Sequence, residues 1–378
     1  MIRIPPHIQS LQPYVAGKPI AELAREKNLS RIVKLASNEN PLGPSPKALE
    51  AARLALLESH RYVDPGSYDL VHALAVKHHK PPQQIVCASG VDALLGYIIK
   101  AFSEDGDEVL TSEGTFIGIY VNTNKHRRRL CQVPLRQYHY DLDAILDAIS
   151  PHTRIIYIAN PNNPTGTIVT AAEFSQFMTR VPADILVVLD EAYYSYAATN
   201  PEYPRGLTLN HENLIVARTF SKDYGLAGLR LGFAVGAEYL IRELYKVKLP
   251  FEPNYIAQCA GIAALTDDEF IRKVVVLNER NLARMSFRLA ELGIQQVHSD
   301  ANFILMLMPT EQFAMDFNAA CLERGLILRH VRSFGIPNGI RINSGTNEEI
   351  SFALAVIEEV YAQLHGREHG RLPNTNKG

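Results

Sequence analysis

Short apolar runs alternate with amphipathic stretches through the middle of this 378-residue chain. Most of the apolar runs are continuous in Ile, Val and Leu, which is typical of strands buried on both faces of a sheet. They predict strands at 85–88, 108–111, 129–133, 154–159, 185–189, 214–217 and 232–235. The stretches between them predict helices at 92–102, 116–125, 142–149 and 171–179. This alternation predicts an α/β fold with a mostly parallel central sheet.

The pattern changes after about residue 254, where two long helical stretches follow each other without a strand between them. These helices are expected at 254–265 and 267–292, followed by strands at 303–308, 326–328 and 339–342 and helices at 310–324 and 347–364. This order predicts a second, smaller α/β domain. We expect an N-terminal arm over 1–45 that packs with the small domain, a large domain over 46–260, a small domain over 261–365 and a disordered tail over 366–378.

Composition narrows the function classes but does not indicate the chemistry. Lys plus Arg total 38 and Asp plus Glu total 40, so the net charge of −2 does not favour a nucleic-acid partner. No apolar run approaches the roughly 20 residues of a membrane helix, and the first residues lack the apolar region of a secretory signal. The four scattered cysteines have no metal-binding spacing. These features predict a cytoplasmic enzyme or binding protein with no metal site and no membrane association.

The segment Arg218–Gly232 carries the sharpest chemical signal. A hydroxyl-rich turn follows a predicted strand and delivers Lys222, and Arg230 follows eight residues later between two glycines. A lysine can hold an aldehyde cofactor as a Schiff base, and an arginine fork can hold the phosphate of that cofactor. Taken alone, the same residues also fit a basic surface loop.

Three further segments strengthen the cofactor hypothesis when they are combined. Asp190 closes an apolar strand, where ligands bind in open α/β sheets, and could pair with a protonated pyridine nitrogen or simply cap a helix. Asn163 lies in an Asn-Pro-rich turn and could bind a ligand oxygen or be structural. Gly90 precedes a predicted helix whose free N–H groups could cradle a phosphate. All four segments occur in an order that fits one sheet. Finding the four together by chance is far less probable than finding any one of them.

These residues resemble the fold-type I PLP-dependent aminotransferases (PLP is pyridoxal 5′-phosphate), and in particular the histidinol-phosphate aminotransferase group. The resemblance extends from about Ile8 to Leu364 and includes the segment Leu35–Pro46 with its Asn-Glu-Asn-Pro box and the Arg61-Tyr62 pair. It implies a large domain with a mostly parallel sheet, a smaller α/β domain and a PLP cofactor. It also implies amino transfer between histidinol phosphate, or a related aromatic or imidazole-containing amine, and a 2-oxo acid, as in histidine biosynthesis.

The resemblance also assigns roles around the cofactor. It implies that Lys222 binds PLP covalently and later moves protons, that Asp190 pairs with the ring nitrogen, and that Tyr193 acts with them in catalysis. Tyr193 and Asn163 would bond the phenolic oxygen of the cofactor. The remaining cofactor contacts that it implies are Gly90, Val91, Asp92, Thr219, Ser221 and Arg230 at the phosphate, and Phe116 stacked on the ring.

Other implied residues concern the dimer and the substrate. Tyr62 matches a tyrosine that reaches the cofactor phosphate of the neighbouring subunit, so a homodimer with active sites at its interface is implied. Arg341 matches the arginine that holds the substrate carboxylate or its phosphate-bearing end. Tyr14, Asn40 and Arg329 match further positions that contact the substrate.

Several residues depart from the family pattern. Phe116 stands where tyrosine is frequent, and Ala93 where an acidic residue is frequent. The others lie beside the expected substrate pocket and are His330, Arg332, Phe334, Asn343 and Ser344. They leave open a PLP-dependent lyase, decarboxylase or cyclase that acts on another amino acid, because the pocket selects which bond breaks. A non-catalytic binding protein is disfavoured, because the lysine is present and no DNA-binding segment is attached.

Overall fold

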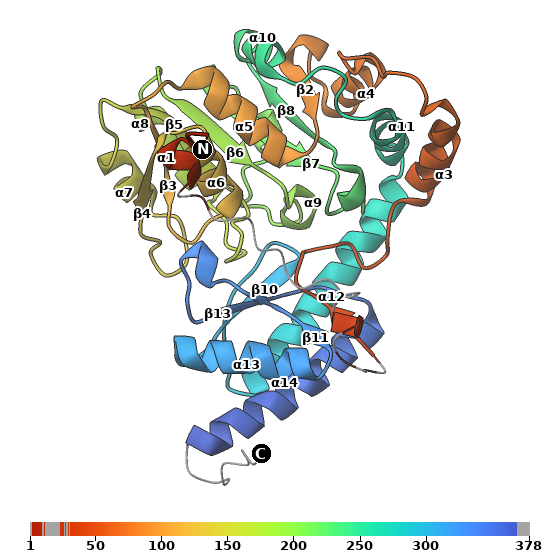
Figure 1. Ribbon diagram of the computed structural model, residues 1–378, viewed down its shortest axis with the longest axis vertical. Helices are drawn as coiled ribbons and strands as arrows, with labels where there is room; N and C mark the ends of the chain where they lie inside the picture. Colours follow the sequence, from red (N-terminus) through yellow and green to blue (C-terminus); the bar gives the residue numbers. More distant parts are fainter. Residues whose placement is uncertain are drawn as a thin grey trace.

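The computed structural model describes residues 2–9, 11, 23–25, 27, 29 and 31–368. Tyr14 and residues 369–378 of the predicted tail lie outside the described residues. Figure 1 shows a larger sheet in the upper part of the molecule and a smaller sheet below it, with the two C-terminal helices at the lower end. The predicted α/β fold with a mostly parallel central sheet is confirmed.

The larger sheet has seven strands in the order β2-β8-β7-β6-β5-β3-β4. Neighbours from β7 to β4 run parallel, and only β8 runs antiparallel to the others. The strands are β2 (Ile85–Ala88), β3 (Glu108–Ser112), β4 (Arg129–Val133), β5 (Thr153–Ala159), β6 (Leu186–Asp190), β7 (Leu214–Thr219) and β8 (Gly232–Gly236). All seven were predicted, with ends that differ by at most two residues, because buried parallel strands leave uninterrupted apolar runs.

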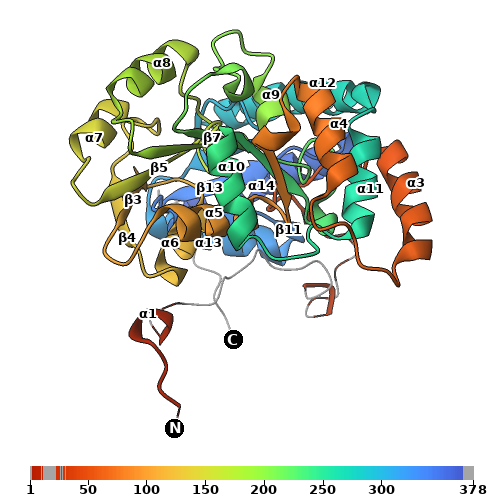
Figure 2. The same cartoon turned by 90° about the horizontal axis from the view of Figure 1, so that it is seen from above.

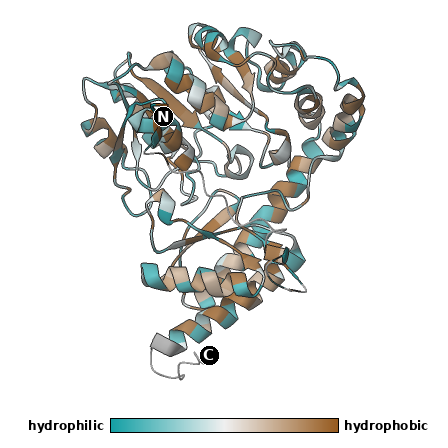
Figure 3. Ribbon diagram, viewed as in Figure 1, coloured by the Kyte–Doolittle hydropathy of each residue, from teal (hydrophilic) through white to brown (hydrophobic). Residues whose placement is uncertain are grey.

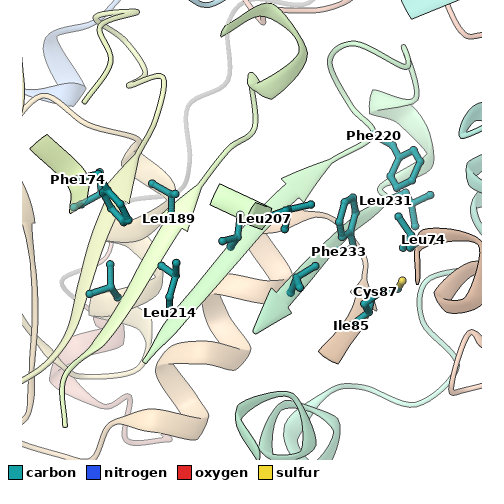
Figure 4. Close-up of a cluster of buried hydrophobic side chains, with 14 of the residues drawn as sticks. Leu74, Ile85, Cys87, Phe174, Leu189, Leu207, Leu214, Phe220, Leu231 and Phe233 are labelled. Carbon is teal, nitrogen blue, oxygen red and sulfur yellow. The ribbon is translucent and has the colours of Figure 1, made fainter. Parts of the chain in front are cut away.

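Both faces of this sheet are buried, as the continuous runs predicted. In β6, Val187 and Leu189 face one apolar cluster, whereas Leu186 and Val188 face another. Figure 4 shows part of the first cluster, including Phe174, Leu189 and Leu214. Figure 3 shows the same pattern at the scale of the whole chain, with apolar strands inside and mixed helices outside.

Helices cover each face of the large sheet (Figure 2). One face is covered by α5 (Val91–Phe102), α6 (Ile117–Lys125) and α10 (Glu238–Val247), whose apolar residues join the second cluster. The other face is covered by α3 (Pro46–Ala55), α4 (Tyr68–His78), α7 (Leu142–Asp147), α8 (Ala171–Arg180) and α11 (Tyr255–Ala264). Local caps define several starts: Ser45 accepts a hydrogen bond from Ala48 N, and Thr170 forms a capping box with Glu173.

The smaller sheet is antiparallel, with the order β12-β13-β10-β9. Its strands are β9 (Gln295–Val297), β10 (Phe303–Leu307), β12 (Arg329–His330) and β13 (Gly339–Asn343). It packs with α12 (Asp268–Glu291), α13 (Glu311–Glu323) and α14 (Asn347–Glu368). The sequence did not predict β9 and β12, because they are short and mostly polar, whereas the equally short but apolar strand at Leu326–Ile327 was predicted.

The segment before α3 joins the small domain through a two-stranded parallel pair. In this pair β1 (Val33–Lys34) lies beside β11 (Leu326–Ile327), and Asn343 N donates to Leu35 O. The long helix α12 contacts both α14 and α9 (Tyr194–Ala197), so it runs along both sheets. We propose that the chain divides into an arm, a large domain and a small domain, with the second boundary near the start of α12, because the boundary expected after residue 260 falls within α11, which packs against the large sheet. Within the described residues, no helix is long and apolar enough to cross a membrane.

Candidate active site

One edge of the large sheet gathers the chemically suggestive segments. The carboxyl ends of β2, β5, β6 and β7 meet there, together with the amino end of antiparallel β8. A cavity of about 240 Å³ opens at this edge and extends to the small sheet. The predicted residues that line it are Val91, Asp92, Phe116, Asn163, Asp190, Tyr193, Thr219, Ser221, Lys222, Arg230, Arg329 and Arg341. Four cationic side chains and two carboxylates therefore face one space.

Lys222 lies just beyond the end of β7, and its side chain is partly buried. Its Nζ donates to Ser37 O at 3.2 Å and lies 5.9 Å from the ring centre of Tyr193. Burial, followed by the charge of Arg341, lowers the pKa of Lys222 from 10.5 to about 8. A substantial fraction of neutral amine is therefore present at mildly alkaline pH, and the neutral amine is the form that can attack an aldehyde.

Asp190 ends β6 and is also buried. Tyr157 donates its hydroxyl to Asp190 Oδ2 at 2.8 Å, and Ala192 N donates to Oδ1 at 3.1 Å. Burial raises the pKa of Asp190 to about 6 despite these two hydrogen bonds. The alternative that Asp190 caps a helix is wrong, because Tyr193 occupies the N-cap position of α9. A cation placed beside Asp190 would stabilise its ionised form.

The start of α5 forms a cradle for an anion. Gly90 has a φ of 91°, and a Cβ atom added there would lie 2.7 Å from Arg230 Nη2. The positive φ favours glycine, and the absence of a side chain leaves room for the Arg230 guanidinium beside the backbone. No side chain caps α5, so its first N–H groups point toward the cavity edge. The Thr219 and Ser221 hydroxyls are hydrogen-bonded to each other at 2.9 Å beside this cradle.

The opposite end of the cavity is formed by the small sheet. Arg341 in β13 is buried and donates through Nη1 to Asn163 Oδ1 and through Nη2 to Ala36 O at 2.8 Å. Because the Asn163 oxygen accepts from Arg341, the amide N–H₂ of Asn163 is the group that can donate to a ligand oxygen. Arg329 in β12 also lines the cavity, with its guanidinium 5.8 Å from the Phe334 ring centre.

Comparison with known proteins agrees with this arrangement. Residues 30–357 match the family model of aminotransferase class I and II. The chain is 42% identical over 362 residues to histidinol-phosphate aminotransferase of Anaeromyxobacter sp., covering 94% of this chain and 98% of that protein. It is 40% identical to histidinol-phosphate aminotransferase 2 of Hydrogenovibrio crunogenus over 94% of this chain and 95% of that protein.

This chain belongs to the class I and II aminotransferase family. Among solved structures, it is similar to histidinol-phosphate aminotransferase from Sinorhizobium meliloti in complex with pyridoxal 5′-phosphate, with a TM-score of 0.89 and 30% identity. That match covers 96% of this chain and 99% of the other. The predicted resemblance to the histidinol-phosphate aminotransferase group is confirmed.

The cavity of this aminotransferase fits PLP by its own chemistry. The cradle at Gly90 and Arg230 suits a phosphate, the buried Asp190 suits a cationic ring nitrogen, and Lys222, with its lowered pKa, suits an aldehyde carbon. The Phe116 ring lines the same cavity and offers an apolar face. Among the described residues, no group of three or more His, Cys, Asp or Glu side chains could hold a metal ion.

Two other predicted site residues lie away from the cavity lining. Asn40 donates through Nδ2 to Asp223 O at 2.7 Å and accepts from Leu42 N, so it supports the backbone next to Lys222. Tyr62 is 86% exposed and stacks on Phe251 with ring centres 4.6 Å apart.

Sequence reasoning missed three polar residues that line the cavity, namely Ser37, Asn38 and Tyr157. Tyr157 lies within the apolar strand β5, and a phenol at a fully buried strand position requires a hydrogen-bond partner, which was the available signal. Asn38 belongs to the Asn-Glu-Asn-Pro box, but no spacing rule placed it beside Tyr193. Its location depends on how the arm packs between the two sheets.

Several departures from the family pattern point away from the cavity. His330 bonds Pro337 O through Nε2, and Arg332 pairs with Glu311 at 3.0 Å on the surface. Phe334 does line the cavity. Asn343 and Ser344 are buried behind the cavity and bond the arm and the adjoining loop. The residues that motivated a different reaction are therefore mostly structural.

Proposed function

We propose that this chain is a PLP-dependent aminotransferase that moves an amino group between histidinol phosphate and a 2-oxo acid. The observation that carries the proposal is that the partly buried Lys222 and the buried Asp190 face one cavity bounded by arginines at each end. One arginine end suits the cofactor phosphate and the other suits an anionic substrate. The family assignment and the histidinol-phosphate aminotransferase relatives support this reaction and this substrate.

The protein groups have separate roles in this proposal. When bound, PLP supplies an aldehyde for the amine and an electron sink for the substrate carbon. Lys222 would hold the cofactor covalently, and its amine, when free, would accept the proton of the reacting carbon and return it. Asp190 keeps the ring nitrogen protonated. Tyr193 and the Asn163 amide donate to the phenolic oxygen, and Phe116 stacks on the ring.

Substrate recognition is proposed to rest on Arg329 and Arg341. Planar guanidinium groups bind phosphate and carboxylate in a bidentate manner. The phosphate of histidinol phosphate and the carboxylates of a 2-oxo acid can therefore use the same end of the cavity in turn. The remaining phosphate contacts on the cofactor side are Gly90, Val91, Asp92, Thr219, Ser221 and Arg230.

The test combines cofactor trapping with a substrate panel. Purified protein loaded with PLP is reduced with borohydride, and we expect the cofactor mass on the peptide that contains Lys222 and not on the same peptide of Lys222→Ala. In a separate, unreduced sample of the PLP-loaded protein, histidinol phosphate should convert the bound cofactor to its amine form, and 2-oxoglutarate should reverse the change. A protein that leaves the cofactor in its aldehyde form with every amino donor would instead be a lyase, decarboxylase or cyclase.

The proposal includes a cytoplasmic homodimer with active sites at its interface. Support comes from apolar side chains exposed on and near α3: Leu54, Leu56, Leu57, Tyr62 and Phe251. Such a face is more apolar than a monomer surface requires. Sedimentation should give twice the chain mass, and Leu57→Asp should weaken the dimer, whereas Val276→Asp on α12 should not. A wild-type monomer would contradict this part of the proposal.

A further inference from the structure

Five buried asparagines connect the arm to the small domain behind the cofactor cavity. They are Asn38, Asn278, Asn281, Asn302 and Asn343, each at most 5% exposed. A buried amide is costly unless it is hydrogen-bonded. Asn278 donates to Ala301 O and Asn281 to Gly345 O, so α12 fixes the two loops that carry Asn302 and Ser344.

The backbone of Asn38 is fixed on both sides by this cluster. Asn38 N donates to Asn343 Oδ1 at 3.0 Å, and Asn302 Nδ2 donates to Asn38 O at 3.2 Å. Its φ of 55° is left-handed, a conformation that asparagine tolerates better than most residues. Asn343, one of the departures from the family pattern, therefore holds Asn38 in place.

The side chain of Asn38 meets the phenol of Tyr193. Asn38 Nδ2 donates to Tyr193 Oη at 2.7 Å, and the Tyr193 ring packs edge-on against Phe303 with centres 5.2 Å apart. An amide N–H₂ is a donor only. The phenol oxygen must therefore accept from Asn38, and the phenol's own O–H cannot be directed at Asn38.

We propose that Asn38 is a positioning residue that fixes the direction of the Tyr193 hydrogen bond, so that the phenol donates to the phenolic oxygen of the cofactor. This inference rests on the proposed PLP function. Donation to that oxygen spreads its negative charge, which lowers the proton affinity of the nitrogen that joins Lys222 to the cofactor. Asn38 therefore sets the pH at which the bound cofactor changes colour, although it does not contact the reacting atoms.

The test reverses the hydrogen bond with the near-isosteric variant Asn38→Asp. An ionised carboxylate only accepts hydrogen bonds, so the Tyr193 hydroxyl would donate to the new carboxylate and no longer to the cofactor. The visible spectrum of the PLP-loaded protein is titrated with pH. We expect the midpoint of this titration to rise by about one pH unit, which is a ten-fold gain in proton affinity. The same rise is expected for Tyr193→Phe.

A double-mutant cycle separates this effect from the added charge. If the bond direction is the cause, Asn38→Asp should add almost nothing in a Tyr193→Phe background. A full shift in that background would overturn the inference, since the charge alone would then be acting. Asn278→Asp, a matched change at a buried asparagine that does not touch Tyr193, should leave the midpoint within about 0.2 units.

If Asn38→Asp does not fold, the double-mutant cycle is run with Asn38→Ala. We expect Asn38→Ala to raise the midpoint of the titration by a smaller amount, and to add no rise when Tyr193→Phe is already present. No rise would overturn the inference. A wild-type protein without a pH-dependent cofactor spectrum would overturn the proposed function and this inference together, whereas a normal wild-type titration with an unmoved Asn38 variant would overturn the inference alone.

Discussion

Arg329 and Arg341 lie directly opposite each other in the antiparallel pair β12–β13, and both side chains line the same cavity. Their guanidinium carbons lie 5.8 and 6.0 Å from the centre of one ring, that of Phe334. Like charges directly opposite each other on a sheet are unfavourable unless an anion binds them. The pair therefore predicts a site whose occupant carries a phosphate or carboxylate group.

Arg341→Lys tests this site. Lysine keeps the charge but loses the planar fork that bonds Asn163 and Ala36 O, so the anion is bound by a point charge only. We expect kcat/KM for histidinol phosphate to fall about 10- to 100-fold, with retained cofactor binding. Steady-state kinetics measures the change. Arg332→Lys, which alters a surface arginine paired with Glu311, is the control and should change kcat/KM less than two-fold.

Tyr157→Phe removes the phenol that donates to Asp190. A hydrogen bond to a charged group contributes about 1.5–3 kcal/mol, so the ionised carboxylate becomes less favourable and its pKa rises further above about 6. We expect the dissociation constant of PLP at pH 7.5 to rise about ten-fold or more. Spectral titration of the cofactor-free protein measures it. Tyr140→Phe alters another buried tyrosine, bonded to Thr115 and Ala159 N, and an equal loss there would argue for a general packing effect.

Asp223→Asn should stabilise the cofactor-free protein in a pH-dependent manner. Burial raises the pKa of Asp223 from 3.8 to about 6, despite hydrogen bonds from Ser195 and Tyr224 N. A raised carboxyl pKa favours the folded state below about pH 3.8, and this contribution is lost as pH rises through about 6. Ionised Asp223 therefore destabilises the fold at neutral pH, by up to about 3 kcal/mol.

Urea unfolding at pH 4.5 and 7.5 measures the Asp223 effect. The gain of Asp223→Asn over wild type should be larger at pH 7.5 than at pH 4.5. Asp143→Asn, which removes an exposed carboxylate paired with Arg180, should show no such difference. An equal gain at both pH values would mean that ionisation of Asp223 is not the cause.

Glu191→Ala should strongly destabilise the protein. Glu191 accepts from Arg218 Nε and Nη2 at 2.8 and 2.7 Å and from Gly206 N, and both charged side chains are buried. Removing one partner of a buried pair leaves an uncompensated charge and costs about 3–5 kcal/mol. The free energy of unfolding in urea measures the loss. Glu269→Ala, at an exposed pair with Lys273, should cost less than about 1 kcal/mol, and a similar value at Glu191 would refute the argument.

The sequence predicted the elements whose burial leaves a long local signal. The seven central strands appear as apolar runs because both faces of the sheet are covered, and the helices between them have amphipathic patterns. The order of motifs along those strands was also sufficient to place Lys222, Asp190, Asn163 and Gly90 at one edge, since parallel strands end on the same side.

The tertiary structure decided what depends on packing between distant segments. The short strands β1, β9 and β12 exist through their pairing partners, and no periodic pattern indicates them. The pairing of β12 with β13 likewise sets Arg329 opposite Arg341, and no pattern in the sequence indicates this register. Asn38 meets Tyr193, which is 155 residues away along the chain, because the arm packs against the small domain. Local sequence therefore determined the sheet and indicated the residues proposed to hold the cofactor, whereas contacts between distant segments decided which side chains meet, because a hydrogen bond requires both partners to be placed in space.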